Sequence, residues 1–586
     1  MLSGHGPVIL GLHTLGKKFT FFGLNNAVIA SGISKELLLS LHNSVDDLDP
    51  VIYSEYSNVV SKINPKLGKR SHVDFLAEGE VKNYELFGSV ESRASYKSSV
   101  ELTPLASEVK HFLKHEYSKP DLSWKPFNIA LRQYTNPTTI PSDVLRASCQ
   151  VFHDHVSSVI PAGTVVDYLK PMTIVMAVNG KSCVKFIDGI NRSTSAGHPF
   201  NRSKLHYLEN FSNEDFPDGV LPNEDIMSVY RDMMSQYEKG NRANVVFKAT
   251  LKDEPVKESK AIAGKTRVFT GAPFPFVIIV RQYYMPVIKF MQENSNVFKI
   301  AVGINASNWE WDRFVRNLSK HPNWLDGDYS AFDKGMSRME ITIAIEFMIS
   351  MAAIFGRYTE KDIRLMHAIK EDMVQALIDY DGSLITFMGG NPSGSPLTVI
   401  INCIVNVIRF VAAYITLVKR YDFFKEVELC TYGDDVVATV SDEAGDVYNF
   451  RTISEVYKSW NIAFTDASKS DVVQNFNVRE DIQFLKRKFR FDSELNRYMA
   501  PLDEESIYKS MYIWNRSKSI SKEDQLAQIL ESAHREFFQY GRDLFDNKRG
   551  FIEGLYARFS NKQLPTYDEY LKAYQEQEEN YSPYEY

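Results

Sequence analysis

The segment Glu426 to Val440 reads EVELCTYGDDVVATV. Two runs of apolar and β-branched residues flank Gly433, Asp434 and Asp435, a pattern that predicts a β-hairpin whose turn displays adjacent carboxylates. Gly-Asp is also ordinary turn chemistry, so the hairpin taken alone is compatible with a purely structural turn. The neighbouring segments favour a catalytic role.

Upstream, Trp324 to Met336 reads WLDGDYSAFDKGM, which predicts a short strand ending at Asp328 with Asp333 five residues further on. If this strand pairs with the hairpin, Asp328, Asp434 and Asp435 converge at one edge of a sheet. Three carboxylates at such short distances repel one another unless cations lie between them. Their hard oxygen atoms favour Mg²⁺ as that cation. Two such ions would serve in-line phosphoryl transfer. The alternative is that Asp328 or Asp333 caps the helix that follows.

Between these acids, Met388 to Asn402 reads MGGNPSGSPLTVIIN, a loop of Gly, Pro and Ser that runs into an apolar helix. Thr398 and Asn402 are four residues apart, so they share one helix face. A buried polar group without a partner costs about 1–3 kcal/mol, and we expect a catalytic cleft to supply the partners. The alternative is that the loop is only a flexible connection.

The segment Leu397 to Val418 is long and apolar enough to cross a membrane. It carries Asn402, Asn406 and Arg409, and an Arg in mid-span costs roughly 2.5–3.5 kcal/mol. The segment therefore predicts a buried helix with one polar face, and the sequence predicts no transmembrane segment.

The composition is that of a large globular protein: the chain has 586 residues, of which 44% are hydrophobic, 24% charged and 13% aromatic. Its four cysteines are far apart with no CxxC pair, which excludes a disulfide scaffold and a cysteine zinc cluster and fits a reducing compartment. The net charge of −7 excludes a simple polycation that coats nucleic acid.

The acids and the intervening loop, in this order, resemble the palm of the RNA-dependent RNA polymerases of picorna-like positive-strand RNA viruses. The chain resembles the dicistrovirus and marnavirus branches more than the enteroviruses. Asp328 and Asp333 match the family's Asp-x4-Asp motif, and Tyr432 to Asp435 matches Tyr-Gly-Asp-Asp. The motif Ser-Gly-x4-Thr-x3-Asn is matched by Ser393, Gly394, Thr398 and Asn402.

Further motifs of the same family are matched outside this region. The residues are Lys469 within FTDASKS, Phe484, Leu485, Lys486 and Arg487 at the end of the palm, Thr194, Ser195, Ala196 and Gly197 in the template loop of the fingers, and Lys252, Lys265 and Arg267 in the arm that binds the nucleotide. The resemblance runs from about Gly79 to beyond Tyr540.

The resemblance implies an α+β fold, the closed right hand of these polymerases, with fingers, a palm of antiparallel sheet plus helices, and a helical thumb. It places the fingers with palm insertions at 79–323, the palm with a portion of the fingers at 324–483, and the end of the palm, the thumb and an acidic tail at 484–586. Residues 46–78 have the composition of a linker.

Residues 1–45 resemble the last strands of the chymotrypsin-like cysteine protease that precedes the polymerase in such polyproteins. The similarity lies in Val8 to Gly16 and Asn26 to Ala30, and His13 would line a pocket for a Gln or Glu side chain. No cysteine precedes Cys149, so the nucleophile is missing and the segment is predicted to be an inactive remnant. A plain strand-turn-strand hairpin is the alternative.

The resemblance also assigns roles. Asp328 and Asp434 would bind two Mg²⁺ ions, for which Mn²⁺ can substitute, with Asp435 as a weaker ligand, and Lys469 would be the general acid for the leaving pyrophosphate. Lys252, Lys265 and Arg267 would bind the triphosphate. Asp333 and Asn402 would read the ribose 2′-hydroxyl beside Ser393, Gly394 and Thr398. The template loop and the segment 484–487 would contact template and primer.

The implied partners are template and primer RNA, nucleoside triphosphates, a protein-primer peptide encoded upstream, and other viral replication proteins. The implied location is the host cytoplasm, at membrane-associated replication complexes. A reverse transcriptase or another palm-domain polymerase is one alternative, but such enzymes place a bulky ring near the sugar where this chain has small polar residues. A catalytically inactive RNA-binding replication protein is the second alternative.

Overall fold

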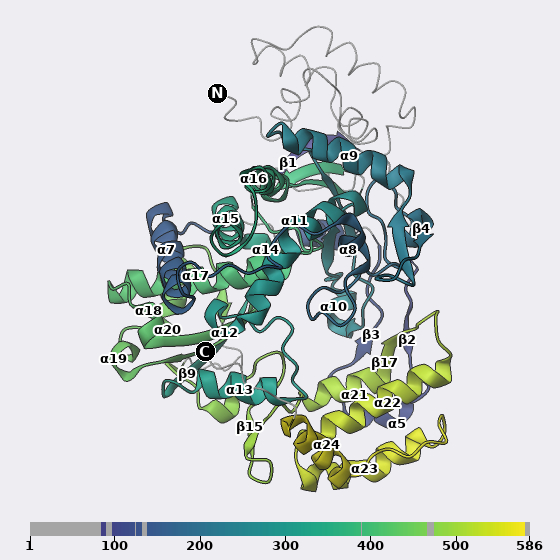
Figure 1. Cartoon of the computed structure of the whole chain (residues 1–586). Helices are drawn as coiled ribbons and strands as arrows, with labels where there is room; N and C mark the ends of the chain where they lie inside the picture. The colour runs from purple at the N-terminus through teal and green to yellow at the C-terminus, as the bar shows by residue number, and fades with distance from the viewer. Residues whose placement is uncertain are drawn as a thin grey trace.

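The computed structural model describes residues 84–89, 97–123, 125–131, 137–381, 383–387, 389–465 and 474–579. The predicted protease remnant (1–45), the predicted linker (46–78) and Lys469 lie outside the described residues. The described part contains both helices and strands, as an α+β fold requires (Figure 1).

The sheet that carries the hairpin has four strands in the order β12-β13-β9-β14. Strands β12 (Val427–Tyr432) and β13 (Asp435–Val440) form the predicted hairpin, and β9 (Asn323–Tyr329) is the strand predicted upstream. Strand β13 pairs antiparallel with β9, and β14 (Phe464–Thr465) lies on the far side of β9. The predicted pairing of strand and hairpin is therefore confirmed.

Both faces of this sheet are covered, which explains why its strands read as continuous apolar runs. On β13, Val436 and Ala438 join the largest core, whereas Val437 joins a smaller core on the other face with Trp311 and Phe489. The largest core contains residues from both sides of the predicted boundary at 323/324, so packing does not separate fingers from palm there.

The long apolar segment forms α17 (Thr398–Val418), which packs against α7 (Ser142–Val159), α15 (Arg338–Phe355), α20 (Phe450–Ser459) and β12 (Figure 1). In the described part of the chain, α17 is the helix long and apolar enough to cross a membrane, and 89% of its most apolar window is buried inside the fold. The prediction of a buried core helix is confirmed.

A second sheet has the order β1-β11-β10-β6-β8 and joins segments far apart in the sequence. Its members are β1 (Tyr84–Ser89), β11 (Ser383–Phe387), β10 (Leu377–Tyr380), β6 (Val246–Leu251) and β8 (Val268–Gly271). Strands β10 and β6 are parallel. This sheet continues through β8 into the long helix α11 (Phe274–Glu293).

The C-terminal helices gather around a core of their own at the yellow end of Figure 1. They are α21 (Glu504–Tyr512), α22 (Lys522–Phe538), α23 (Arg542–Tyr556) and α24 (Tyr567–Glu579). Strand β17 (Ile513–Asn515) of this region pairs with β2 (Val100–Leu102), so a segment from the N-terminal part of the described chain lies beside the C-terminal helices.

The remaining helices and strands complete the described fold. The helices are α5 (Ala106–Val109), α6 (Lys125–Leu131), α8 (Ile174–Asn179), α9 (Glu224–Glu238), α10 (Glu258–Ile262), α12 (Ser295–Phe298), α13 (Trp309–Leu318), α14 (Phe332–Gly335), α16 (Glu360–Val374), α18 (Phe423–Glu426) and α19 (Asp442–Gly445). The strands are β3 (Tyr117–Ser118), β4 (Leu208–Phe211), β5 (Gly219–Pro222), β7 (Val256–Lys257), β15 (Arg490–Asp492) and β16 (Arg497–Met499).

Candidate active site

The tip of the β12-β13 hairpin brings three carboxylates to one edge of the sheet. Tyr432 is paired with Asp435 across the turn, and Gly433 has φ 64°, a left-handed conformation that favours glycine. In β9, Gly327 is paired with Val436 of β13, so Asp328, one residue further along, lies beside the tip. The three predicted palm acids therefore lie together.

The carboxylates form one electrostatic group. Burial raises the pKa of Asp434, and the charge of Asp328 raises it further. Burial likewise raises the pKa of Asp435 to about 6, with the charges of Asp434 and Asp328 adding to the effect. Each group is easier to ionise when a cation balances this negative field.

A divalent cation fits this edge of the sheet. Among the residues that the structure describes, no three Asp, Glu, His or Cys side chains gather closely enough to form a complete protein cage for a metal. Mg²⁺ commonly binds through one or two carboxylates and completes its coordination with water and substrate phosphates. The mutually repelling carboxylates thus have the donor chemistry for such an ion.

Helix α17 holds the turn from beneath. The hydroxyl of Tyr329 donates to Asn406 Oδ1 (3.0 Å), and Asn406 Nδ2 donates to the carbonyl oxygens of Gly433 and Asp434 (both 3.1 Å). The Sγ of Cys403 accepts a hydrogen bond from the Gly433 N–H (3.0 Å). The sequence marked Asn406 only as a polar residue on an apolar helix. Its position one turn beyond Asn402 was the available signal for its role.

Asp333 lies beneath the same edge and contacts Asn402. Asn402 Nδ2 donates a hydrogen bond to Asp333 Oδ1, so the predicted pair is in contact. Burial raises the pKa of Asp333 to about 6, although the hydrogen bond from Asn402 opposes this rise. The role of the pair in reading a ribose stays a prediction.

The capping alternative for the two upstream acids is wrong. Asp328 lies within β9, and the residue that precedes α14 is Ala331, which has φ 54° and makes no side-chain capping bond. Asp333 lies inside the first turn of α14 and uses its carboxylate across the site.

The loop before α17 is anchored at both ends, so the alternative of a merely flexible connection is also wrong. Thr270 of β8 donates its N–H to Ser393 Oγ (3.1 Å) and accepts from the Gly394 N–H through its carbonyl (2.8 Å). A Cβ at Gly394 would lie 2.4 Å from this carbonyl oxygen. The hydroxyl of Thr398 donates to Pro392 O (2.6 Å), so it supports the loop itself.

Basic side chains face the acids from two directions. Lys252 and Arg267 both pair with Glu254, at 3.1 and 3.4 Å, and Lys265 is exposed on the same arm. The pKa values of Asp333 and Asp434 are raised overall, and the positive charge of Arg267 partly opposes the rise in each. Arg267 therefore acts electrostatically on both carboxylates.

The second group of basic side chains near the acids belongs to the segment Phe484 to Arg487. Leu485 and Lys486 have φ 56° and 59°, and Phe484 is buried in the core behind the sheet. The charge of Lys486 lowers the pKa of Asp435. Arg487 instead pairs with Glu536 of α22 at 2.8 Å, which joins this segment to the C-terminal helices. Of the four predicted residues, Lys486 is therefore the one whose charge acts on the acids.

Comparison with known proteins identifies the family. A family model described as viral RNA-dependent RNA polymerase matches residues 164–556, more than half of the chain. The chain belongs to this family. Viral RNA-dependent RNA polymerases use divalent metal ions, in agreement with the acidic edge. The reverse transcriptase alternative is wrong, because the family copies RNA into RNA.

Curated relatives of the polymerase include two replicase polyproteins of insect viruses. That of Drosophila C virus (strain EB) is 27% identical over 595 residues, covering 96% of this chain and 33% of the relative. That of cricket paralysis virus is 29% identical over 431 residues, covering 69% and 24%. The chain thus spans at most a third of the length of these relatives.

A solved structure shares the fold of the polymerase. The sicinivirus 3Dpol RNA-dependent RNA polymerase matches with a TM-score of 0.65 and 18% identity, covering 84% of this chain and 98% of that chain. Nearly the whole of that polymerase therefore has a counterpart here, which confirms the predicted α+β polymerase fold.

The predicted template loop of the polymerase is held rigidly by a lysine that sequence reasoning missed. Lys204 Nζ donates to Thr194 Oγ1 (2.5 Å) and to Ser195 O (2.9 Å), and burial lowers the pKa of Lys204 to about 8. Ala196 accepts a hydrogen bond from the first residue of α11, and Gly197 has φ 75°. A single lysine without a motif gave no signal in the sequence.

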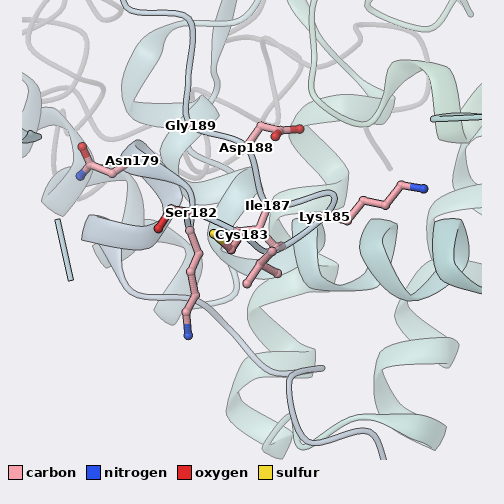
Figure 2. A pocket seen from close by; sticks show the side chains of 9 residues that line it. Asn179, Ser182, Cys183, Lys185, Ile187, Asp188 and Gly189 are labelled. Carbon is pink, nitrogen blue, oxygen red and sulfur yellow. The ribbon is translucent and has the colours of Figure 1, made fainter. Parts of the chain in front are cut away.

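A separate hollow of 410 Å³ lies beside α8 (Figure 2). Lys185 on its rim bonds Glu310 of α13 at 2.6 Å, which closes the loop onto that helix. None of the palm acids lines this hollow, so it does not belong to the site. The lining residues are Asn179, Lys181, Ser182, Cys183, Val184, Lys185, Ile187, Asp188 and Gly189.

Proposed function

We propose that this chain synthesises RNA on an RNA template by nucleotidyl transfer, as the replicating enzyme of a positive-strand RNA virus. The observation that carries the proposal is the single acidic edge formed by Asp328, Asp434 and Asp435, faced by Arg267 and Lys486. Carboxylates can bind metal ions, and the Arg and Lys side chains that face them can bind phosphates. This edge of the sheet therefore suits a substrate that carries phosphates together with metal ions.

Asp328 and Asp434 would hold two Mg²⁺ ions, with Asp435 as a weaker ligand, and Mn²⁺ would substitute. Bound there, the ions supply positive charge that stabilises the attacking and leaving oxygens of the phosphoryl transfer. The support for these ligands is the shared field that raises the pKa of Asp434 and of Asp435.

The basic arm would bind the triphosphate. Lys252 and Arg267 are 42% and 71% exposed and share the carboxylate of Glu254. Exposed ion pairs of this kind contribute only about 0–1 kcal/mol, so a triphosphate can replace Glu254 as their partner. Lys265 would add a third positive charge from the same arm. Arg can bind phosphate oxygens bidentately, which would orient the nucleotide.

The remaining roles follow from the predicted motifs. Asp333 and Asn402 would read the 2′-hydroxyl, and Lys469 would donate a proton to the leaving pyrophosphate. The template loop 194–197 and Lys486 would contact template and primer. Further partners would be a protein-primer peptide and other replication proteins, at membrane-associated complexes in the host cytoplasm.

Primer extension on a homopolymeric RNA template with Mg²⁺ tests the proposal. We expect Asp434→Asn and Asp328→Asn to abolish nucleotide addition without lowering the melting temperature, since both changes keep the size of the side chain and remove the charge that would bind a metal ion. Asp446→Asn, an exposed carboxylate of the α19-α20 connection, is the matched control and should retain activity. Robust elongation by either palm variant would overturn the metal assignment. RNA binding without synthesis by the unaltered chain would support the inactive alternative.

A further inference from the structure

Asn391, which precedes Pro392 in the loop before α17, contacts three of the residues proposed to surround the ribose. Its backbone N–H donates to Asp333 O (2.8 Å). Its side-chain Nδ2 donates to Thr398 O (3.2 Å) and to Asn402 Oδ1 (2.8 Å). Only 4% of Asn391 is exposed, so these contacts are made in the interior. The backbone and side chain of this one residue thus join α14, the loop and α17.

The polarity of this hydrogen-bond chain is set by a backbone group. The carbonyl of Thr398 can only accept, so the end of the Asn391 amide that faces it must be Nδ2. The same Nδ2 meets Asn402, which must therefore offer its only acceptor, Oδ1. The opposite end of the Asn402 amide, Nδ2, is left to face Asp333. Because the Thr398 carbonyl cannot rotate, the whole chain has one direction.

This direction decides what the Asn402–Asp333 pair offers to a sugar. With Nδ2 turned toward Asp333, Asn402 has a second N–H for a hydroxyl oxygen, and the second carboxylate oxygen of Asp333 can accept the hydroxyl proton. If the Asn402 amide were reversed, its Oδ1 would face the Asp333 carboxylate and two acceptors would oppose each other. Thr398 cannot take over the donor role, because its hydroxyl donates to Pro392 O.

We propose that Asn391 is a positioning residue for sugar selection, which fixes the amide of Asn402 in the orientation that recognises the 2′-hydroxyl of the incoming ribonucleotide. This inference rests on the proposed function. Asn391 itself does not touch the substrate. It acts through Asn402, and its effect belongs to the choice of sugar more than to the rate of phosphoryl transfer.

Two variants of nearly the same size test the inference. Asn391→Leu removes both donated hydrogen bonds. Asn391→Asp keeps the shape but can only accept, so it competes with Asp333 for the Asn402 amide. The quantity to measure is the ratio of kcat/KM for a ribonucleotide to kcat/KM for its 2′-deoxy analogue, on one template. We expect Asn391→Asp to narrow this ratio by about tenfold or more, and Asn391→Leu to narrow it less.

Asn406→Leu is the matched comparison, because Asn406 is also a buried asparagine of this region but bonds the carbonyls of Gly433 and Asp434. It should lower both kcat/KM values in the same proportion and leave the ratio unchanged. The melting temperature of each variant measures its folding separately from its activity.

The outcomes separate the inference from the proposed function. If the unaltered chain makes no RNA, or does not prefer ribonucleotides, the proposed function fails and the inference fails with it. If the unaltered chain discriminates but both Asn391 variants keep its ratio, only the inference is overturned. Equal proportional losses for both sugars in both Asn391 variants would show that Asn391 supports the fold alone, and would overturn the inference too.

Discussion

Replacing Arg409 with methionine would leave a buried carboxylate without its cation beneath the active site. Arg409 and Glu340 are each 1% exposed, and Nε of Arg409 lies 2.7 Å from Oε1 of Glu340. The guanidinium also lies 4.3 Å from the ring centre of Phe332, the residue before Asp333. The pair therefore joins α17 to the start of α15 directly below the proposed sugar site.

The expected loss of stability follows from what remains after the change. Glu340 keeps its hydrogen bonds from Ser337 and Thr138 but loses the only positive charge that the structure places against it in the described interior. Removing one partner of a buried ion pair costs about 3–5 kcal/mol. The double variant Arg409→Met with Glu340→Leu removes both charges. It should lose only about 1–2 kcal/mol, chiefly from the capping box that Glu340 closes at α15.

Thermal unfolding measures this prediction. At about 2–4 °C per kcal/mol, Arg409→Met should melt about 6–20 °C below the unaltered protein, and the double variant should recover most of that difference. The recovery of the melting temperature in the double variant is the decisive observation. If Arg409→Met were destabilising only because it leaves a cavity, replacing Glu340 as well would not restore the melting temperature.

The pH dependence supplies a second readout. Burial raises the pKa of Glu340, but the charge and hydrogen bond of Arg409, together with the hydrogen bonds from Thr138 and Ser337, hold the pKa below its usual value. The pair therefore stabilises the unaltered protein above about pH 4.5, and this contribution is lost as the pH falls. In Arg409→Met burial dominates the pKa of Glu340, so Glu340 is neutralised at a higher pH. The difference in stability between the unaltered protein and Arg409→Met should therefore shrink as the pH falls. Additive losses in the double variant, with a deficit independent of pH, would refute the reasoning.

Three further predictions concern the rest of the chain. Deleting residues 1–78 should leave RNA synthesis unchanged or raise it, and a deletion that unfolds the protein would show that the segment belongs to the core. Asp333→Ala and Asn402→Ala should each lose more efficiency with ribonucleotides than with 2′-deoxynucleotides, measured as the ratio of kcat/KM values. Burial raises the pKa of Asp435 to about 6, so in EDTA the melting temperature should fall as the pH rises from about 4 to 6. Asp435→Asn should make that fall smaller, and the raised pKa values of Asp333 and Asp434 account for the part that remains.

The sequence by itself determined the parts of the site that depend on local patterns. The two β-rich runs around Gly433 specify the hairpin whatever surrounds it, because Gly supplies the left-handed turn and β-branched residues favour strands. The spacing of Asp328, Asp333 and the Gly-Asp-Asp turn then sufficed to place the chain in its family. Helix α17 was also predictable, since its length, apolar character and single polar face are all local properties.

Only the tertiary structure decided which distant groups meet. The sequence assigned no role to Asn391 within the loop of Gly, Pro and Ser, yet this residue joins Asp333 to Asn402. Lys204 carried no motif, although it holds the template loop. Thr398 was expected in the cleft, but its hydroxyl is used within its own loop. Hydrogen-bond partners far apart in the sequence depend on which segments pack together. Local propensity and periodicity do not specify that packing, so these contacts could not be predicted from the sequence.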